Sequence, residues 1–146
     1  MKVLIQRVKN AGVKVEGNEI SYITQGILAF VGIEKGDTRE QVEKLAGKVV
    51  NLRIFPDEND KMNRSLIDIN GEMLIVSQFT LCGDCKKGTR PSFDRSAPPD
   101  IANELYDYFV TQVQSHGIKT GTGKFGAMME VSLINDGPVT FMLELN

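Results

Sequence analysis

Alternating and continuous apolar segments divide the chain into short elements. Val13 and Val15 alternate with polar neighbours, and the Gly17-Asn18 pair that follows predicts a tight β-hairpin turn. The continuous apolar run at 27–33 is typical of a strand covered on both faces. The spacing then becomes helical after capping signals at Asp37 or Thr38, with one apolar face formed by Val42, Leu45, Ala46, Val49 and Val50.

The second half of the chain repeats these signals. The pattern predicts a short strand at 53–55 and a second hairpin, in which strands 66–69 and 73–81 flank Asn70-Gly71. Prolines 98 and 99 indicate the start of a helix that ends at Gly117. Strands at 129–133 and 139–145 flank a predicted turn at 135–138. The apolar face of this second helix is expected to carry Ile101, Leu105, Phe109 and Val113.

These elements indicate an α/β protein with mixed β-sheets, about nine strands and two helices packed on one side. The 146 residues are 41% hydrophobic and 25% charged, with no linker, repeat or low-complexity stretch. This composition is ordinary for one globular domain, so we expect a single domain over residues 1–146. A chain of this length buries roughly 68–70% of its unfolded surface and needs no metal or disulfide for stability.

Charge limits the range of partners. The net charge is −2 and the estimated pI is 5.5, which gives no general attraction to nucleic acid. Any RNA contact must be local, and the best candidate is segment 83–95, where Lys86, Lys87, Arg90 and Arg95 outnumber two aspartates. A solvated loop is the alternative. No window approaches a membrane-spanning run, so we expect a cytoplasmic protein with no membrane or DNA partner.

Three motifs suggest other chemistry. Residues 121–126 satisfy G-x-G-x-x-G, but the motif follows a helix and precedes a strand, which is the wrong context for a dinucleotide site. Cys82 and Cys85 form a lone C-x-x-C that lacks a fourth zinc ligand, and the loop after it is unlike a thioredoxin helix. His116, the only histidine, falls at the predicted end of the second helix, where the macrodipole favours it. We therefore expect chemistry without a histidine base, a metal or a cofactor.

Two distant segments, Ser77-Gln78-Phe79-Thr80-Leu81 and Asn135-Asp136-Gly137-Pro138-Val139-Thr140, carry the most functional information. Together they resemble the paired signature of the D-aminoacyl-tRNA deacylases. The resemblance covers essentially the whole chain through further matching segments, namely Ile5–Val8, Arg53–Phe55, Lys61–Asn63, Arg90–Phe93, Leu105–Phe109 and Val131–Leu133.

The resemblance implies hydrolysis of an activated ester, the bond between an amino acid and the terminal ribose of tRNA. The neighbouring ribose hydroxyl would assist attack by water, and the protein would supply position and oxyanion stabilisation. Within the segment Ser77 to Thr80, which includes Gln78, the backbone N–H groups of Phe79 and Thr80 are the expected oxyanion donors. Thr80 could alternatively be a nucleophile, although no base for its hydroxyl is evident.

The resemblance also implies a homodimer with a barrel-like fold, in which a Gly137-cis-Pro138 dipeptide enters the active site of the opposite subunit. Its carbonyls would leave no room for an L side chain, whereas a D-residue or glycine would fit. Arg7 matches a position that supports this dipeptide, and Phe125 and Met129 match positions that line the adenosine pocket. Ordinary packing is the alternative for these three residues.

The tRNA contacts are expected at Lys86, Lys87 and Arg90. The residues, taken without the resemblance, leave two other functions open. One is a noncatalytic RNA-binding domain on the same fold, since a fold does not determine chemistry. The other is a redox or metal protein that uses Cys82 and Cys85.

Overall fold

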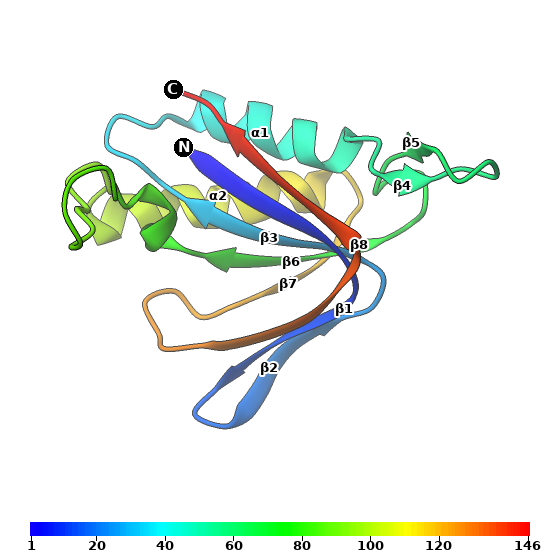
Figure 1. The fold of residues 1–146 in the computed structure, drawn as a ribbon, viewed down its shortest axis with the longest axis horizontal. Coiled ribbons are helices and arrows are strands. Elements are labelled where there is room, and N and C mark those ends of the chain that lie inside the picture. Colours follow the sequence, from blue (N-terminus) through cyan, green and yellow to red (C-terminus); the bar gives the residue numbers. More distant parts are fainter.

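A six-stranded mixed β-sheet forms the centre of the molecule. The structure, a computed structural model, describes residues 1–146. The sheet has the strand order β2-β1-β3-β6-β7, and β8 pairs with β1, while β4 and β5 form a separate two-stranded ribbon (Figure 1). The elements are β1 (Lys2–Val15), β2 (Asn18–Ile23), β3 (Gly26–Gly32), α1 (Arg39–Asn51), β4 (Phe55–Pro56), β5 (Met62–Arg64), β6 (Glu72–Ser77), the 3₁₀-helix η1 (Phe79–Cys82), α2 (Pro99–Ser115), β7 (Lys119–Thr122) and β8 (Glu130–Glu144).

The central strand β3 is covered on both faces, as its continuous apolar run predicts. It pairs antiparallel with β1 and parallel with β6, and β6 pairs parallel with β7. Ile27 and Ala29 belong to the larger core cluster, whereas Leu28 belongs to the smaller one on the opposite face. Alternate side chains of one strand therefore contribute to two separate cores.

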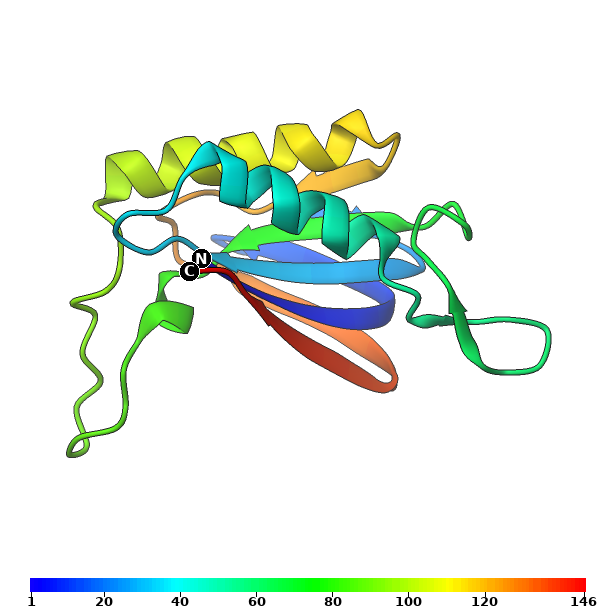
Figure 2. The same cartoon turned by 90° about the horizontal axis from the view of Figure 1, so that it is seen from above.

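Both helices cover the same face of the sheet (Figure 2). Thr38 caps α1, because its side chain accepts from the Gln41 amide and the Gln41 side chain accepts from the Thr38 amide, which completes a capping box. Helix α2 begins at Pro99 and is followed by Gly117 with a φ of 81°. The larger core, 23 buried residues, includes residues from both helices and from the sheet.

The other face of the sheet curls into a barrel-like shape around the smaller core of seven buried residues. Ser21 on β2 donates its hydroxyl to the Thr122 carbonyl on β7 at 2.6 Å and accepts from the Thr122 amide at 3.1 Å. These contacts join strands at opposite ends of the sheet order, so the barrel is nearly closed. The predicted fold class, mixed sheets with two helices on one side, is confirmed.

The predicted second hairpin is wrong. Residues 66–70 form turns and not a strand, and β6 pairs only with the parallel strands β3 and β7. Asn70 has the positive φ of a turn residue, 54°, but the segment before this turn is a loop and not a strand. The apolar residues before Asn70-Gly71 gave a misleading strand signal, because Leu66 is fully buried within a turn and not in a strand. With this strand removed, the structure has eight strands and not about nine.

Several boundaries also differ from the predictions. β6 ends at Ser77, and residues 79–82 turn into η1 where a strand to Leu81 was expected. The first hairpin turns at Glu16 and Gly17, one residue earlier than predicted. The short strand expected at 53–55 begins only at Phe55. Ile101, expected on the buried face of α2, is 46% exposed, and Tyr106 occupies the core instead.

The predicted turn at 135–138 lies inside the single strand β8. Its pairing with β1 is interrupted by two register shifts, between Gln6 and Val8 and between Val8 and Asn10. The segment opposite Arg7 is therefore a bulge that bends a continuous strand. Neither α-helix is long and apolar enough to cross a membrane.

Candidate functional site

The segment Ser77 to Thr80 lies where β6 leaves the sheet. Ser77 is the last residue to pair with β3, opposite Val31, and the Gln78 amide donates to the Val31 carbonyl at 2.8 Å. The chain then turns into η1, and the Phe79 side chain points away from the core, 59% exposed. The backbone at this edge is thus anchored by the sheet, while its side chains remain accessible.

The N–H groups of Phe79 and Thr80 precede the first hydrogen bond of η1, which runs from the Leu81 amide to the Gln78 carbonyl at 3.2 Å. Neither group has an acceptor within the helix, as expected for the first residues of any helix. The Gln78 side-chain amide donates to the Thr80 hydroxyl oxygen. A donor in this position cannot remove the hydroxyl proton, so the contact gives Thr80 no general base.

The loop that follows β7 packs against the end of β6. The Gly123 amide and the Tyr106 hydroxyl both donate to the Ile75 carbonyl, at 3.2 and 2.6 Å, and the Tyr106 ring lies 6.2 Å from that of Phe125. A Cβ at Gly123 would lie 2.6 Å from the Met129 sulfur, which shows how closely Met129 covers this glycine. The structure therefore brings Phe125 and Met129 close to the Ser77 edge.

Tyr106 is a residue of this region that the sequence interpretation passed over. It lies beside the apolar stripe of α2 and is buried, and burial raises the pKa of its hydroxyl above the usual value. The hydroxyl therefore stays protonated and acts as a donor. Tyr106 lies within the matching segment Leu105–Phe109, but a tyrosine next to a helical apolar face is a common arrangement and did not suggest this contact.

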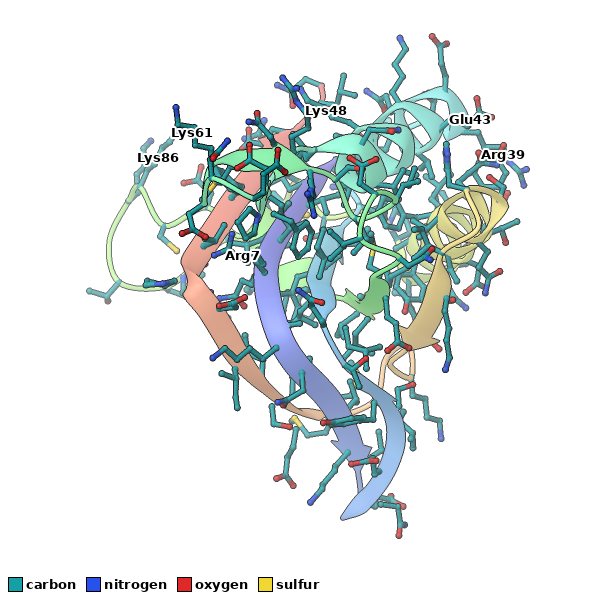
Figure 3. The ribbon with its side chains drawn as sticks, turned by 90° about the vertical axis from the view of Figure 1, so that its right-hand side faces the viewer. Arg7, Arg39, Glu43, Lys48, Lys61 and Lys86 are labelled. Carbon is teal, nitrogen blue, oxygen red and sulfur yellow. The ribbon has the colours of Figure 1, made fainter.

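The Gly137-Pro138 peptide bond is cis, and both residues are exposed. Arg7 holds the segment from β1: its Nε donates to the Asp136 carbonyl at 2.8 Å and its Nη1 donates to the Ile54 carbonyl at 2.7 Å (Figure 3). Arg7 thus connects the bulge of β8 to the chain just before β4. Arg7 therefore contacts the residue that precedes the dipeptide, and its role in supporting the dipeptide stays a prediction.

Asn135 closes the same bulge from the other side. Its side-chain oxygen accepts from the Val139 amide at 2.7 Å, and its side-chain nitrogen donates to the Thr140 hydroxyl at 3.0 Å. Asparagine commonly bonds to nearby backbone in this way. The motif that contains Asn135 was noted in the sequence, but its part in bracing the dipeptide is visible only in the structure.

The two signature segments are not adjacent within one chain. Arg7, opposite the dipeptide, pairs with Ile27, whereas Ser77 pairs with Val31, four residues farther along β3. The offset is about 13 Å along the strands and about 14 Å across the three spacings from β8 to β6, or about 19 Å in all. Figure 1 shows the β6 arrowhead and the bend of β8 at opposite sides of the sheet.

The basic loop after η1 is pinned at its base and exposed at its tip. Asp84 and Ser92 exchange backbone hydrogen bonds of 2.7 and 2.9 Å, and Gly88 turns the tip with a φ of 62°. Lys86, Lys87 and Arg90 are all exposed. None has a carboxylate within 4.0 Å, so their charges are not neutralised by the chain itself.

The cysteines and the histidine lie in ordinary structural environments. Cys82 is buried and donates its thiol to the Ile33 carbonyl at 3.6 Å, and burial raises its pKa, the opposite of what a reactive thiolate needs. Cys85 is a free, exposed thiol. No cluster of three His, Cys, Asp or Glu residues suited to a metal ion is found. His116 caps the C-terminus of α2, as predicted.

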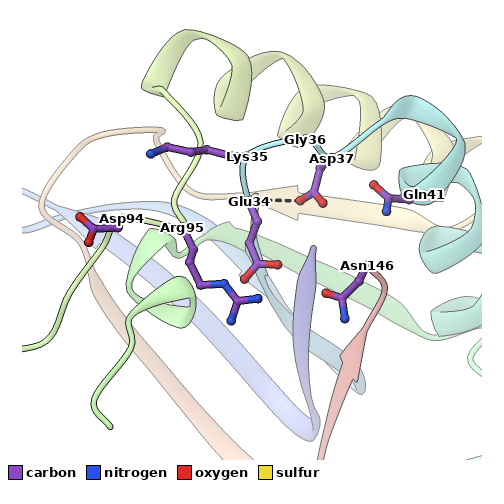
Figure 4. A pocket seen from close by; sticks show the side chains of 8 residues that line it. All are labelled: Glu34, Lys35, Gly36, Asp37, Gln41, Asp94, Arg95 and Asn146. Atoms are coloured by element: carbon purple, nitrogen blue, oxygen red, sulfur yellow. Dashed lines mark hydrogen bonds between the residues drawn. The ribbon is translucent and has the colours of Figure 1, made fainter. Parts of the chain in front are cut away.

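A polar hollow of about 400 Å³ between Glu34, Asp37, Arg95 and Asn146 is the other candidate by shape (Figure 4). Two of its carboxylates have partners within the chain: the Met1 ammonium lies 3.2 Å from Glu34 and 2.9 Å from Asp37, and Asp37 also accepts from the Glu34 amide at 2.6 Å. These internal ion pairs stabilise the start of β1. The carboxylates of Glu34 and Asp37 are therefore held in ion pairs within the chain.

Comparison with known proteins shows the family of the chain. The model of the family described as "D-Tyr-tRNA(Tyr) deacylase" matches residues 4–144. The chain belongs to the D-aminoacyl-tRNA deacylase family. A D-aminoacyl-tRNA deacylase of Thermosipho africanus is 58% identical over 144 residues, 99% of this chain and 97% of the relative, and one of Desulfatibacillum aliphaticivorans is 57% identical over 99% of both chains.

Solved structures agree with this deacylase fold. One named "c-Myc DNA Unwinding Element Binding Protein" is 41% identical with a TM-score of 0.94, and covers 100% of this chain and 99% of its own. Another, titled "Structural Analysis of a probable eukaryotic D-amino acid tRNA deacylase", has a TM-score of 0.85 at 19% identity over 99% and 98%, and supports the fold alone. The predicted family and activity are confirmed: the chain is a hydrolase of the aminoacyl-tRNA ester bond.

Proposed function

We propose that the deacylase is a homodimer in which each active site combines two subunits. Ser77 to Thr80 of one subunit would face Gly137 and Pro138 of the partner subunit. The observation that carries this proposal is the strand register, which at ordinary strand spacing places Ser77 about 19 Å from the dipeptide in one chain, too far for both to contact one amino acid.

The outer edge of β8 supports a contact between two copies. β8 pairs only with β1, which leaves its other edge without a partner, and unpaired edges favour pairing with another chain. Three large apolar side chains of this strand, Ile134, Phe141 and Met142, are 43–51% exposed. Burial of these groups would add apolar contact near the dipeptide.

In the proposed reaction, water attacks the ester carbonyl and the free hydroxyl of the same ribose accepts its proton. The N–H groups of Phe79 and Thr80 stabilise the negative oxygen. The ester C–O bond then breaks, and the proton taken up by the neighbouring hydroxyl passes to the leaving ribose oxygen, which releases the amino acid and restores both ribose hydroxyls of tRNA. The accessible start of η1 supports this role. No side chain has to act as nucleophile, which agrees with the donor contact on Thr80.

Selectivity would come from backbone contact. The carbonyls of the dipeptide face the α-carbon of the substrate and leave no room for an L side chain, so D-residues and achiral glycine are the proposed substrates. Arg7 orients the dipeptide, Phe125 and Met129 line the adenosine pocket, and Lys86, Lys87 and Arg90 contact phosphates. The enzyme would act in the cytoplasm without a metal or cofactor.

Phe79→Pro tests the backbone mechanism. Phe79 is the first residue of η1, where proline is tolerated because the N–H of this residue has no acceptor within the helix. The proline removes the Phe79 N–H together with the ring, whereas Phe79→Ala removes only the ring. We expect kcat on D-aminoacyl-tRNA to fall about 10²–10³-fold in Phe79→Pro relative to Phe79→Ala. Equal rates in the two variants would exclude the Phe79 N–H as an oxyanion donor.

DNA binding is a second candidate, because one 41% identical structure carries the name of a DNA-binding protein. The net charge of −2 argues against general attraction to a duplex. Titration of the chain with duplex DNA at two salt concentrations, beside tRNA of equal charge, separates the candidates. We expect tRNA to bind more tightly at both concentrations, and tighter binding of the duplex would favour the second candidate.

A further inference from the structure

Two exposed aromatic rings form a pair beside the proposed oxyanion donors. Phe79 and Phe93 are 59% and 39% exposed, and their ring centroids lie 5.2 Å apart with the planes tilted by 59°. A Cβ at Gly83 would lie 3.0 Å from the Phe93 ring, so Phe93 is held against the backbone of Gly83. The ring is therefore fixed on one side and open on the other.

Free positive charge lies next to this pair. A hollow of about 510 Å³ is lined by Gly83 and by three cations, Lys2, Lys86 and Arg95. Lys86 and Arg95 have no carboxylate within 4.0 Å, whereas Lys2 lies 4.0 Å from Glu34 and 3.9 Å from Glu144.

The same hollow also holds two carboxylates. Asp84 accepts from the Lys86 amide at 2.9 Å, and Glu144 lies 3.9 Å from Lys2. Three cations against these two carboxylates leave a net positive charge, and neither Lys86 nor Arg95 is held in an ion pair. The hollow therefore favours an anionic ligand.

Gly83 connects this surface to the reaction centre. Its amide donates to the Thr80 carbonyl at 3.1 Å, so the hollow begins directly after η1. The Asp84–Ser92 bridge fixes the base of the loop that carries the cations. Phe93 and Arg95 are therefore within reach of the nucleotides that precede a terminal ribose bound at Phe79 and Thr80.

We propose that Phe93, Lys86 and Arg95 bind the single-stranded nucleotides of tRNA that precede the terminal adenosine. Phe93 stacks on a base, and Lys86 and Arg95 contact the flanking phosphates. Exposed aromatic rings beside unpaired cations are the combination by which proteins bind single-stranded nucleic acid, and stacking does not require a particular base. This inference rests on the proposed location of the reaction at Phe79 and Thr80.

Two substrates test the proposal: D-aminoacyl-tRNA and the minimal ester D-aminoacyl-adenosine, which lacks the preceding nucleotides. Phe93→Leu keeps an apolar side chain without an aromatic face, and Phe93→Tyr keeps the face. The quantity compared is kcat/KM for D-aminoacyl-tRNA divided by kcat/KM for the minimal ester. We expect Phe93→Leu to lower this ratio about tenfold, by raising KM for the tRNA substrate. Phe93→Tyr should keep most of the wild-type ratio.

Arg95→Gln tests the phosphate contact. We expect it to weaken tRNA binding and to reduce the slope of log K against log salt by about 1. Lys48→Gln is the matched control, because it removes the same charge from the exposed side of α1 and should leave the slope unchanged.

Three results would overturn the proposal. An equal fall for both substrates in Phe93→Leu would assign Phe93 to the geometry of the reaction centre. Dissociation of the dimer by Phe93→Leu, measured by sedimentation, would assign the surface to a second copy of the chain. An unchanged substrate ratio in Phe93→Leu, together with an unchanged salt slope in Arg95→Gln, would show that these residues do not bind the nucleotides. By contrast, a wild type that releases no amino acid from D-aminoacyl-tRNA would contradict the proposed function itself.

Discussion

The Ser77 edge and the dipeptide bulge are both exposed, yet they are built in opposite ways. At the Ser77 edge the backbone N–H groups of Phe79 and Thr80 have no acceptor within their helix. At the bulge, Arg7 and Asn135 hold the backbone on both sides of Gly137 and Pro138. The first segment offers hydrogen bonds to a reacting atom, whereas the second uses its hydrogen bonds internally and presents a rigid surface. Donors suit catalysis and rigidity suits exclusion of the wrong shape.

Gly137→Ala breaks the rigid segment, and its expected effect on the rate is exceeded only by that of Phe79→Pro at the donor edge. Gly137 has a φ of 149°, and a Cβ there would lie 2.7 Å from a Val139 methyl carbon and 3.3 Å from an Arg7 nitrogen. The bulge must shift to accommodate it. We expect kcat/KM on D-aminoacyl-tRNA to fall about 10²-fold, since a displacement of about 1 Å has that effect on positioned groups.

Gly17→Ala is the control for this variant. Gly17 also has a positive φ, 78°, but no atom lies within 4 Å of a Cβ there. Gly17→Ala should lower the free energy of unfolding, measured with urea, by about 1 kcal/mol. It should leave the rate of deacylation unchanged. Full activity in Gly137→Ala would show that the dipeptide does not contact the substrate.

Mixing the Phe79→Pro and Gly137→Ala variants tests whether the two segments of one active site come from different subunits. Phe79→Pro damages only the donor edge, and Gly137→Ala damages only the rigid segment. If each site combines two subunits, mixed dimers regain one intact site of two. Random exchange makes half of the dimers mixed, so we expect about a quarter of wild-type activity. No recovery after demonstrated subunit exchange would place both segments of a site in one chain.

Thr80→Ala separates the backbone from the side chain at the donor edge. The variant keeps the N–H and removes only the hydroxyl that accepts from Gln78. We expect kcat within about fivefold of wild type, because a neutral hydrogen bond contributes about 1 kcal/mol or less. A tRNA without the free neighbouring ribose hydroxyl should, in contrast, be hydrolysed slowly. A folded, substrate-binding but inactive Thr80→Ala would support a nucleophilic threonine.

Replacement of both cysteines has the smallest expected effect. Because burial raises the pKa of Cys82, its thiol stays protonated at neutral pH and contributes no nucleophile. The double variant Cys82→Ala, Cys85→Ala should therefore deacylate at the wild-type rate, with about 1 kcal/mol lost in urea unfolding from the small cavity at Cys82. A chelator should leave the wild-type rate unchanged. Inhibition by the chelator, or an inactive folded variant, would restore the metal or redox interpretation.

Helix boundaries and the central strand were predictable because their determinants are local. Thr38 and Gln41 cap α1 through contacts within one turn, and the continuous apolar run of β3 agrees with burial on both faces. The second hairpin failed for the opposite reason. Asn70-Gly71 is a valid turn signal, but whether residues 66–69 pair with β6 depends on competition from β3 and β7, which are distant in sequence.

The sequence alone determined the family, the two signature segments and the absence of a suitable histidine base, because these depend on which residues are present and in what order. The tertiary structure decided how the segments are used. It turned residues 79–82 into a 3₁₀-helix, placed the dipeptide in a bulge braced by Arg7 and Ile54, and separated the two segments by about 19 Å. Strand register and bulges result from pairing between remote residues, and no local pattern encodes them.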